Sequence, residues 1–529
     1  MIIATPWRER FLSALPVVAG AAALAIALCA PNDTELAMVT VPIILVCAIA
    51  IGHRHPVGAL NGLVLVFMTA HPRLGVARFG VASAGGVRGW VYLADILLLG
   101  VALGTLFKRS SKPRGQWHIP AGALLMLPYV ALSIVLPILG VIWYGVSPSY
   151  ALPAFRWLQW IVLAYLAYHV TNLHGLAVVH AMKRMLLAVV FLHGLYALLQ
   201  LGCYKLTVVP EAFLMWDGEY VAQNLAGKMG SSWFGVRATG LQVNPNSYGL
   251  VAAFVVIAIV AYAMSRAKGS MLVLFLGAAA GALGMLLSGS RTAAVALILV
   301  CASGAVVPLL RPGVLVRWSA MVAGFVLLCG IAASTVDIPF ESAYVSRFGA
   351  TLSSFDSIRT EASMLERQQV WTELLSSSEQ DYPLGTWAPP AYVYPYTVDS
   401  MYVQTLVQGT ALYTVTLIAF IVGAIAVGWR CFTANETGTA AWAGLVLAGW
   451  ALAVAASSFT MGVLNDAEIC APFVAMFGCA AALTNRAAFL PRQVFMVFRV
   501  PGPDLVNGSM PDRRSGSRQR APVVRERRR

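Results

Sequence analysis

The sequence predicts an all-α fold: a polytopic bundle of transmembrane helices with one large, partly helical external loop. Only 11% of the 529 residues are charged, whereas 59% are hydrophobic. Apolar runs of about 18 residues or more recur along the whole chain, and a run of that length can cross the hydrocarbon core of a bilayer as a helix. Together these two observations indicate an integral membrane protein.

The apolar runs predict about 14 helices, with a range of 12–14. The N-terminus has the charged and apolar regions of a signal peptide, but another apolar run begins at Leu36. We therefore expect an uncleaved first helix. The runs are residues 11–29, 36–51, 57–70, 90–107, 119–142, 156–172, 181–202, 247–264, 270–287, 292–309, 314–334, 400–429, 440–459 and 464–484.

The formal net charge of +14 fits a membrane surface better than a nucleic acid, because the basic residues lie mainly in short loops and in the C-terminal tail. With a cytoplasmic N-terminus, nearly all these loops fall on the cytoplasmic side, as the positive-inside rule requires. The exception is the segment 71–90, which we interpret as interfacial. Three longer segments are then external: 71–90, 203–246 and 335–399.

Three parts of the chain follow from this pattern. Residues 1–230 hold the N-terminal transmembrane helices, and residues 231–484 form a second membrane domain that includes the external loop 335–399. Residues 485–529 are basic and we expect them to be a disordered cytoplasmic tail. The eight cysteines lie mostly in apolar runs without CxxC spacing, so we interpret them as small core residues.

The segment from Asp337 to Ser400 is the longest polar stretch between strongly apolar ones. It predicts a helix from Ile358 to Ser376, followed by DYPLGTWAPPAYVYPYT, a rigid loop rich in proline and aromatic residues. Aromatic side chains there suit stacking on sugar rings, and they equally suit an interfacial belt. The candidates for sugar binding are Trp387, Tyr392 and Tyr394.

Outward-facing arginines are the second feature of the predicted external side. The external loop carries three arginines and no lysine. It also carries eight carboxylates ahead of Asp399, so plain salt bridges within the loop are an alternative role for these arginines. Guanidinium groups bind phosphate oxygens through paired, charge-assisted hydrogen bonds. An arginine at full membrane depth costs ~2.5–3.5 kcal/mol, so one near a helix end needs an anionic partner. The candidates for pyrophosphate binding are Arg237, Arg291, Arg347 and Arg367.

Two further short motifs stand at helix starts on the external side. Asn244-Pro245-Asn246 is expected to turn the chain and cap the next helix. Asp399-Ser400 precedes the apolar run at 400–429, where a carboxylate is favoured as a cap. A base that accepts a proton from an attacking sugar hydroxyl would stand at the same position, so Asp399 is also the candidate catalytic residue.

The order of these motifs resembles that of the O-antigen ligase and polymerase superfamily. RATGLQVNPNSYG is followed by SGSRTA, then by a long external segment with RFG and RQQVWTELL, and then by PLGTW and DSMYVQTLVQG. The resemblance covers roughly residues 230–430, and FRWLQW at 155–160 agrees with it in the first half. The resemblance thus implies that residues 231–484 form an O-antigen ligase- or polymerase-like membrane domain.

The resemblance implies an integral-membrane glycosyltransferase of the bacterial inner membrane, with cytoplasmic termini and a periplasmic loop. The implied donor is an undecaprenyl-pyrophosphate-linked glycan, the acceptor is a second glycan, and neither a metal nor another cofactor is used. Other polysaccharide-assembly proteins are further implied partners, and nucleic acid is not. The pyrophosphate-binding role carries over to Arg237 and Arg291, and then to Arg347 and Arg367.

Three functions remain distinguishable at this stage. Ligases of the superfamily have a histidine near the end of the external segment, whereas Asp399 stands there and no histidine follows His193. This difference favours a polysaccharide polymerase, with an O-antigen ligase as the alternative. A flippase or transporter is the alternative of another class, and its candidate charged residues are Asp95, Asp466 and Glu468. His193 is expected to lie away from the site.

Overall fold

The computed structural model describes most of the apolar runs. The described residues are 15–23, 34–69, 75–80, 88–106, 120–145, 151–206, 238–242, 245–265, 271–305, 362–388, 398–435 and 438–489, with the single positions 307, 319, 323, 390, 393 and 394. Most of the predicted run 314–334, most of the segment 203–246, residues 335–361 and the tail from residue 490 lie outside them.

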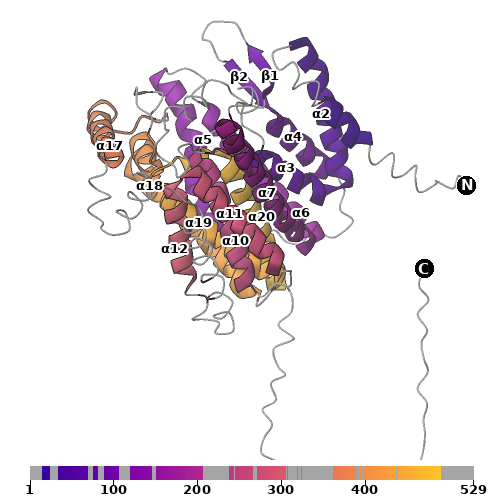
Figure 1. Cartoon of the computed structure of the whole chain (residues 1–529). Helices are drawn as coiled ribbons and strands as arrows, with labels where there is room; N and C mark the ends of the chain where they lie inside the picture. The colour runs from indigo at the N-terminus through magenta and orange to yellow at the C-terminus, as the bar shows by residue number, and fades with distance from the viewer. Residues whose placement is uncertain are drawn as a thin grey trace, which may run out of the picture. The chain divides into compact units, whose positions relative to one another are not determined.

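The described chain is helical, as predicted (Figure 1). Residues Met1–Ala488 cluster into one compact unit, and a second begins at Phe489. The helices are α2 (Thr34–Arg54), α3 (Pro56–Thr69), α4 (Leu93–Leu106), α5 (Ala121–Tyr144), α6 (Leu152–His174), α7 (Leu176–Leu206), α10 (Pro245–Met264), α11 (Met271–Ser288), α12 (Arg291–Gly304), α17 (Ala362–Asp381), α18 (Met401–Ala434), α19 (Thr439–Ser457) and α20 (Ala467–Phe489).

Six of the described helices are long and apolar enough to cross a bilayer, and shorter apolar helices accompany them. The chain is therefore a multi-pass membrane protein. The six spans are Ala121–Tyr144, Leu176–Leu199, Pro245–Met264, Met401–Ala434, Thr439–Ser457 and Ala467–Asn485. The predicted external helix also forms, although it runs from Ala362 to Asp381 and so begins and ends a turn later than the sequence predicts.

A short β-hairpin interrupts the helical order. Strands β1 (Gly75–Gly80) and β2 (Arg88–Tyr92) pair antiparallel, with Phe79 opposite Gly89. Strand β1 lies within the segment 71–90, which the sequence sets apart from the membrane helices, and β2 continues two residues beyond it into the predicted run 90–107.

Helix directions follow from a few contacts at the two ends of the bundle. Near the start of α4 and α6, Asp95 and Arg156 approach to 2.9 Å. At the other end, Thr439 at the start of α19 contacts His180 near the start of α7 at 3.4 Å. There too, Gly438 donates its backbone N–H to the carbonyl of Ser265 just beyond α10. Thus α4, α6 and α10 begin at one end, and α7 and α19 begin at the other.

Charge divides between these two ends. We call the end where α4, α6 and α10 begin the acidic end, because it holds all the carboxylates whose side chains are described: Asp95, Glu373, Glu379, Asp381, Asp399, Asp466 and Glu468. We call the other end the basic end, and its described basic side chains include Arg54, Lys183, Arg184 and Arg430. The described basic residues that the sequence predicts on one side of the membrane thus lie at one end of the bundle, and which side that end faces stays a prediction.

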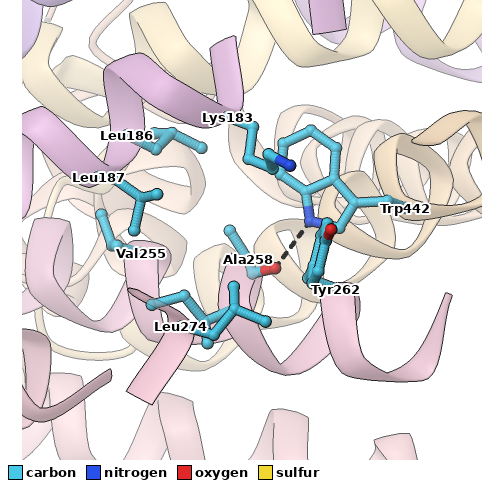
Figure 2. Close-up of a pocket in the computed structure, with 9 residues that line it drawn as sticks. Lys183, Leu186, Leu187, Val255, Ala258, Tyr262, Leu274 and Trp442 are labelled. Atoms are coloured by element: carbon cyan, nitrogen blue, oxygen red, sulfur yellow. Dashed lines mark hydrogen bonds between the residues drawn. The ribbon is translucent and has the colours of Figure 1, made fainter. Parts of the chain in front are cut away.

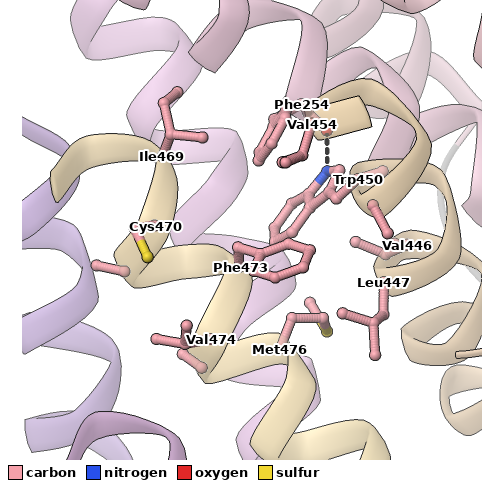
Figure 3. Close-up of a cluster of buried hydrophobic side chains, with 14 of the residues drawn as sticks. Phe254, Val446, Leu447, Trp450, Val454, Ile469, Cys470, Phe473, Val474 and Met476 are labelled. Atoms are coloured by element: carbon pink, nitrogen blue, oxygen red, sulfur yellow. Dashed lines mark hydrogen bonds between the residues drawn. The ribbon is translucent and has the colours of Figure 1, made fainter. Parts of the chain in front are cut away.

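The core centres on α10, which is buried on every face and packs against α7, α11, α12 and α19. Two indoles of α19 donate hydrogen bonds to carbonyls of α10: Trp442 to Ala258 at 2.7 Å (Figure 2), and Trp450 to Phe254 at 2.8 Å (Figure 3). The Trp450 ring also stacks on Phe254, 4.9 Å between centroids. These bonds satisfy the indole N–H groups where no water is at hand.

Close backbone contact joins α18 and α19. A Cβ atom at Gly428 would stand 2.6 Å from the carbonyl oxygen of Gly444, and one at Gly444 would stand 2.5 Å from the carbonyl of Gly428. Such contacts between small residues hold helices together in a bilayer, where burial of apolar surface gives little driving force. The position of α18 beside the core therefore depends on these two glycines.

Candidate functional site

Four helices begin next to one another at the acidic end. The first two contacts involve α10: Ser247 donates a hydrogen bond to the Asp466 carboxylate just before α20, at 2.9 Å. On its other side, Gly249 approaches the turn between α11 and α12, since a Cβ there would stand 2.5 Å from the Cβ atom of Ser290. The starts of α10, α12 and α20 are therefore neighbours.

The loop after α19 joins this group to the start of α18. The hydroxyl groups of Thr292, in the first turn of α12, and Thr460 are 2.7 Å apart. Two residues earlier, Ser458 accepts a hydrogen bond from the backbone N–H of Met401 at 2.8 Å. Because the N-terminus of a helix carries partial positive charge and free N–H groups, four adjacent N-termini favour an anion.

Arg291 is the first residue of α12 and lies within this group of helix starts. Gly289 adopts φ 59° and so allows α11 to stop, after which Ser290 caps α12 by accepting from the N–H of Ala293 at 3.3 Å. This tight turn holds Arg291, partly exposed, at the end of the bundle rather than inside it. The predicted position of Arg291 at a helix boundary is confirmed.

Arg237 and Arg347 lie outside the described residues, as does Tyr392. The residue that follows Arg237 is described: Ala238 donates its backbone N–H to the carbonyl of Leu287 at 2.9 Å. Leu287 is in the last turn of α11, four residues before Arg291. The predicted closeness of Arg237 and Arg291 stays a prediction, and the neighbouring chain segment is consistent with it.

His193 of α7 lies beside the same segment, whereas the sequence analysis places it away from the site. Its ring Nδ1 accepts a hydrogen bond from the backbone N–H of Leu241 at 3.3 Å, and its Nε2 lies 2.9 Å from the Met68 carbonyl. The Nδ1 contact requires the tautomer that carries its proton on Nε2. Long-range contact between α7 and the chain after Arg237 leaves no periodic pattern, so the sequence could not predict it.

Arg367 and Asp399 form an ion pair, with 3.2 Å between Nη2 and Oδ2. It joins α17 to the residue before the α18 cap, and both side chains are partly exposed, 33% and 50%. The cap itself is Ser400, which accepts from the N–H of Val403 at 3.4 Å. The capping role that the sequence offers for Asp399 therefore belongs to Ser400, and Asp399 instead holds α17 near the helix starts.

The aromatic loop after α17 binds to a break in α18. The helix leaves its regular path at Gly409 and Thr410, and the latter has φ 63°. The backbone N–H groups of Thr386 and Trp387 donate to the carbonyls of Val407 and Gln408 at 3.0 and 2.9 Å. These carbonyls lose their partners within α18 at the break, so the loop satisfies them and is itself fixed in place.

The candidate sugar-binding residues Trp387 and Tyr394 lie in surroundings rich in aromatic side chains. Trp387, partly exposed and with φ 53°, has its ring centroid 5.1 Å from that of Tyr144 at the end of α5. The ring of Tyr394 lies 6.3 Å from that of Tyr382. Burial raises the pKa of the Tyr394 phenol, and the nearby Asp381 carboxylate and Tyr382 raise it further. The phenol therefore stays protonated and able to donate a hydrogen bond.

Asp466 is the functional candidate that the sequence analysis assigns only to a transporter. It stands at the N-terminal edge of α20 and at the start of α10 at once. Desolvation raises the pKa of its carboxyl from the ordinary value to about 6, and the hydrogen bond from Ser247 opposes that rise. Glu468, 6% exposed, follows two residues later. No group of three or more metal-ligating side chains occurs in the described part of the chain.

Asp95, the other transporter candidate, is part of a local network at the start of α4 and α6. Its Oδ1 accepts from Arg156 and from Gln159, both at 2.9 Å. Arg156 also donates to Gln159. A carboxylate held by two donors on the neighbouring helix has a structural role, since it ties α4 to α6 without leaving a charge unpaired. FRWLQW at 155–160 supplies both donors.

No model of a known protein family and no curated protein matches this chain.

Proposed function

We propose that this chain is an integral-membrane glycosyltransferase that polymerises lipid-linked oligosaccharide repeat units, as a member of the O-antigen ligase and polymerase superfamily. Its donor is an undecaprenyl-pyrophosphate-linked glycan, and it acts at the outer face of the bacterial inner membrane. The observation that carries the proposal is the group of four helix N-termini at the acidic end, with Arg291 in the first turn of α12.

This arrangement suits a pyrophosphate at the end of a lipid. Each N-terminus contributes partial positive charge to the same small region, and Arg291 adds a planar guanidinium that matches two phosphate oxygens. Arg367 stands nearby on α17, held by Asp399. A lipid tail would lie along the apolar helices while its pyrophosphate remains at the height of the helix ends, beside Arg291.

The reaction then needs little acid catalysis. A hydroxyl of the acceptor sugar attacks C1 of the donor sugar, a new C1–O bond forms, and the bond from C1 to the pyrophosphate oxygen breaks. Arg291 and the helix N-termini stabilise the charge that develops on the departing pyrophosphate. Trp387 and Tyr394, on the loop fixed to α18, provide faces on which a sugar ring stacks.

The proton of the attacking hydroxyl goes to a carboxylate, and Asp466 is a better acceptor than Asp399. A general base works best when its pKa is near the working pH, and desolvation brings the pKa of Asp466 to about 6. Asp399 is more exposed and is already engaged by Arg367. Asp466 also stands against Ser247, at the N-terminus of the helix that follows the Arg237 segment.

The test is a deletion strain complemented with variants, followed by gel separation of its surface glycans. Deletion is expected to leave single-repeat products, and wild-type protein is expected to restore the polymer. Arg291→Ala should not restore it at equal membrane abundance, whereas Arg430→Ala, which removes an exposed arginine at the basic end, should. A normal polymer with Arg291→Ala would overturn the pyrophosphate role.

The pattern of glycans in the deletion strain also separates the three functions. Loss of lipid A-linked glycan with normal lipid-linked polymer would indicate a ligase. Accumulation of repeat units inside the cell would indicate a flippase. Only single-repeat products on the surface agree with the polymerase that we propose.

A further inference from the structure

Gln404 and Asn465 form a hydrogen-bonded pair of side-chain amides among the helix starts at the acidic end. The Nδ2 group of Asn465 donates to Oε1 of Gln404 at 3.2 Å. Gln404 lies in the first turn of α18, and Asn465 is the last residue of the short turn Val463–Asn465 that precedes α20. Neither residue belongs to the groups that hold the pyrophosphate or accept the proton.

The loop that carries Asn465 is fixed to three helices. Its Ser458 carbonyl accepts from the first backbone N–H of α18 at 2.8 Å. The hydroxyl of Thr460 lies 2.7 Å from that of Thr292 in α12, and Asp466 accepts a hydrogen bond from α10 at 2.9 Å. Because these contacts fix the backbone on both sides of Asn465, its side chain is held beside Asp466 before a ligand binds.

The amide pair keeps hydrogen-bonding groups that its own bond does not use. A side-chain amide has an NH2 group with two N–H donors and one carbonyl acceptor. The bond joins an N–H of Asn465 to the carbonyl of Gln404, so the NH2 group of Gln404 and the carbonyl of Asn465 remain. Asn465 is exposed and Gln404 is partly exposed. The glycine at 462 leaves the pair open, since a Cβ atom there would stand 3.1 Å from Nδ2 of Asn465 and 3.5 Å from Oε1 of Gln404.

A donor group beside an acceptor matches neighbouring hydroxyl groups of a sugar, because each hydroxyl both donates and accepts. Asn465 directly precedes Asp466, and consecutive Cα atoms are ~3.8 Å apart, so a single sugar can contact both residues. We propose, in an inference that rests on the proposed function, that Gln404 and Asn465 bind hydroxyl groups of the acceptor sugar and so select the hydroxyl that reaches Asp466. The pair acts on the sugar, whereas Arg291 acts on the pyrophosphate.

The binding of two lipids to the purified full chain in nanodiscs tests the pair. One is the lipid-linked repeat unit purified from the deletion strain, and the other is undecaprenyl pyrophosphate, which carries no sugar. Wild-type protein is expected to bind the repeat unit more tightly. Gln404→Met should weaken binding of the repeat unit about tenfold, the effect of one or two lost hydrogen bonds, and leave binding of undecaprenyl pyrophosphate unchanged. Gln369→Met, the matched control, replaces an exposed glutamine of α17 and should change neither affinity.

Asn465→Ala removes the other amide at an exposed position and should reproduce the loss for the repeat unit alone, even if Gln404→Met lowers the unfolding temperature. Equal losses for both lipids in the two variants would indicate a purely structural link between the loop and α18 and would overturn the inference. So would unchanged binding of the repeat unit, or a wild-type protein that binds the two lipids equally. Unchanged binding of both lipids to Arg291→Ala would instead overturn the proposed function, so the two failures are distinguishable.

Discussion

Replacing Asp466 by asparagine is expected to abolish most polymer formation and to remove the dependence of its rate on pH below neutrality. Desolvation by the surrounding helices raises the pKa of this carboxyl to about 6 in the folded chain. If it accepts the proton of the attacking hydroxyl, the rate follows its ionised fraction, which falls about tenfold for each pH unit below the pKa. At pH 5 the wild-type rate should therefore be about one tenth of its plateau value.

Loss of a positioned general base lowers a rate by about 10²–10⁴-fold, so Asp466→Asn should retain at most about one per cent of the wild-type rate at pH 7.5. The same substitution has a stability readout that does not depend on the reaction. Because the pKa of this carboxyl is higher in the folded than in the unfolded chain, protonation stabilises the folded state. That stabilisation is fully present below pH ~3.9, the pKa of an aspartate in an unfolded chain, and it is lost as the pH rises through about 6. Asp466→Asn should therefore unfold at a higher temperature than wild type at pH 8, and not at pH 4.

The assay measures polymer formation from a lipid-linked repeat unit by purified protein in nanodiscs between pH 5 and 8, with thermal unfolding of the same samples. Asp399→Asn is compared in parallel and should lose less activity, because Arg367 already engages that carboxylate. A wild-type rate without an inflection near pH 6 would refute the reasoning. So would an inflection that persists in Asp466→Asn, or a larger loss in Asp399→Asn.

Two further predictions concern stability in the folded bundle. Arg156→Gln should lower the free energy of unfolding by about 1–3 kcal/mol, because it leaves Asp95, 21% exposed, without its cationic partner. The double variant with Asp95→Asn should recover part of that loss, and full additivity in the cycle would contradict the pairing. Gly428→Ala should destabilise by about 1–3 kcal/mol, since its Cβ would meet the Gly444 backbone. The control is Gly58→Ala, because Gly58 is a helical glycine with open space around it. This substitution should be neutral or should stabilise the chain by about 0.4–1 kcal/mol. Equal effects at Gly58 and Gly428 would contradict the close contact.

The sequence predicts the helices well because the bilayer imposes a strong constraint on them. Long apolar runs have no other stable conformation in lipid, so α10, α18 and α19 begin within a few residues of the predicted starts. The boundary at Arg291 is likewise predictable, because Ser288-Gly289-Ser290 combines a residue suited to positive φ with a capping serine.

The contacts that build the site are less predictable, because they join residues far apart in the chain. Ser247 and Asp466 meet across two helices whose adjacency leaves no periodic signal in the sequence. The external segment holds nine carboxylates, and nothing in the sequence singles out Asp399 among them as the partner of Arg367. The break at Gly409 lies inside a continuous apolar run, where only the pairing with the loop at Trp387 reveals it.

The most direct test of the central claim is the binding of undecaprenyl pyrophosphate to purified wild-type and Arg291→Ala proteins. An arginine that engages a phosphate through charge-assisted hydrogen bonds contributes about 1.5–3 kcal/mol, so the variant should bind at least about tenfold more weakly. Arg430→Ala should bind as wild type does, since it lies at the basic end. Equal affinities of the Arg291→Ala and wild-type proteins for undecaprenyl pyrophosphate would contradict the account.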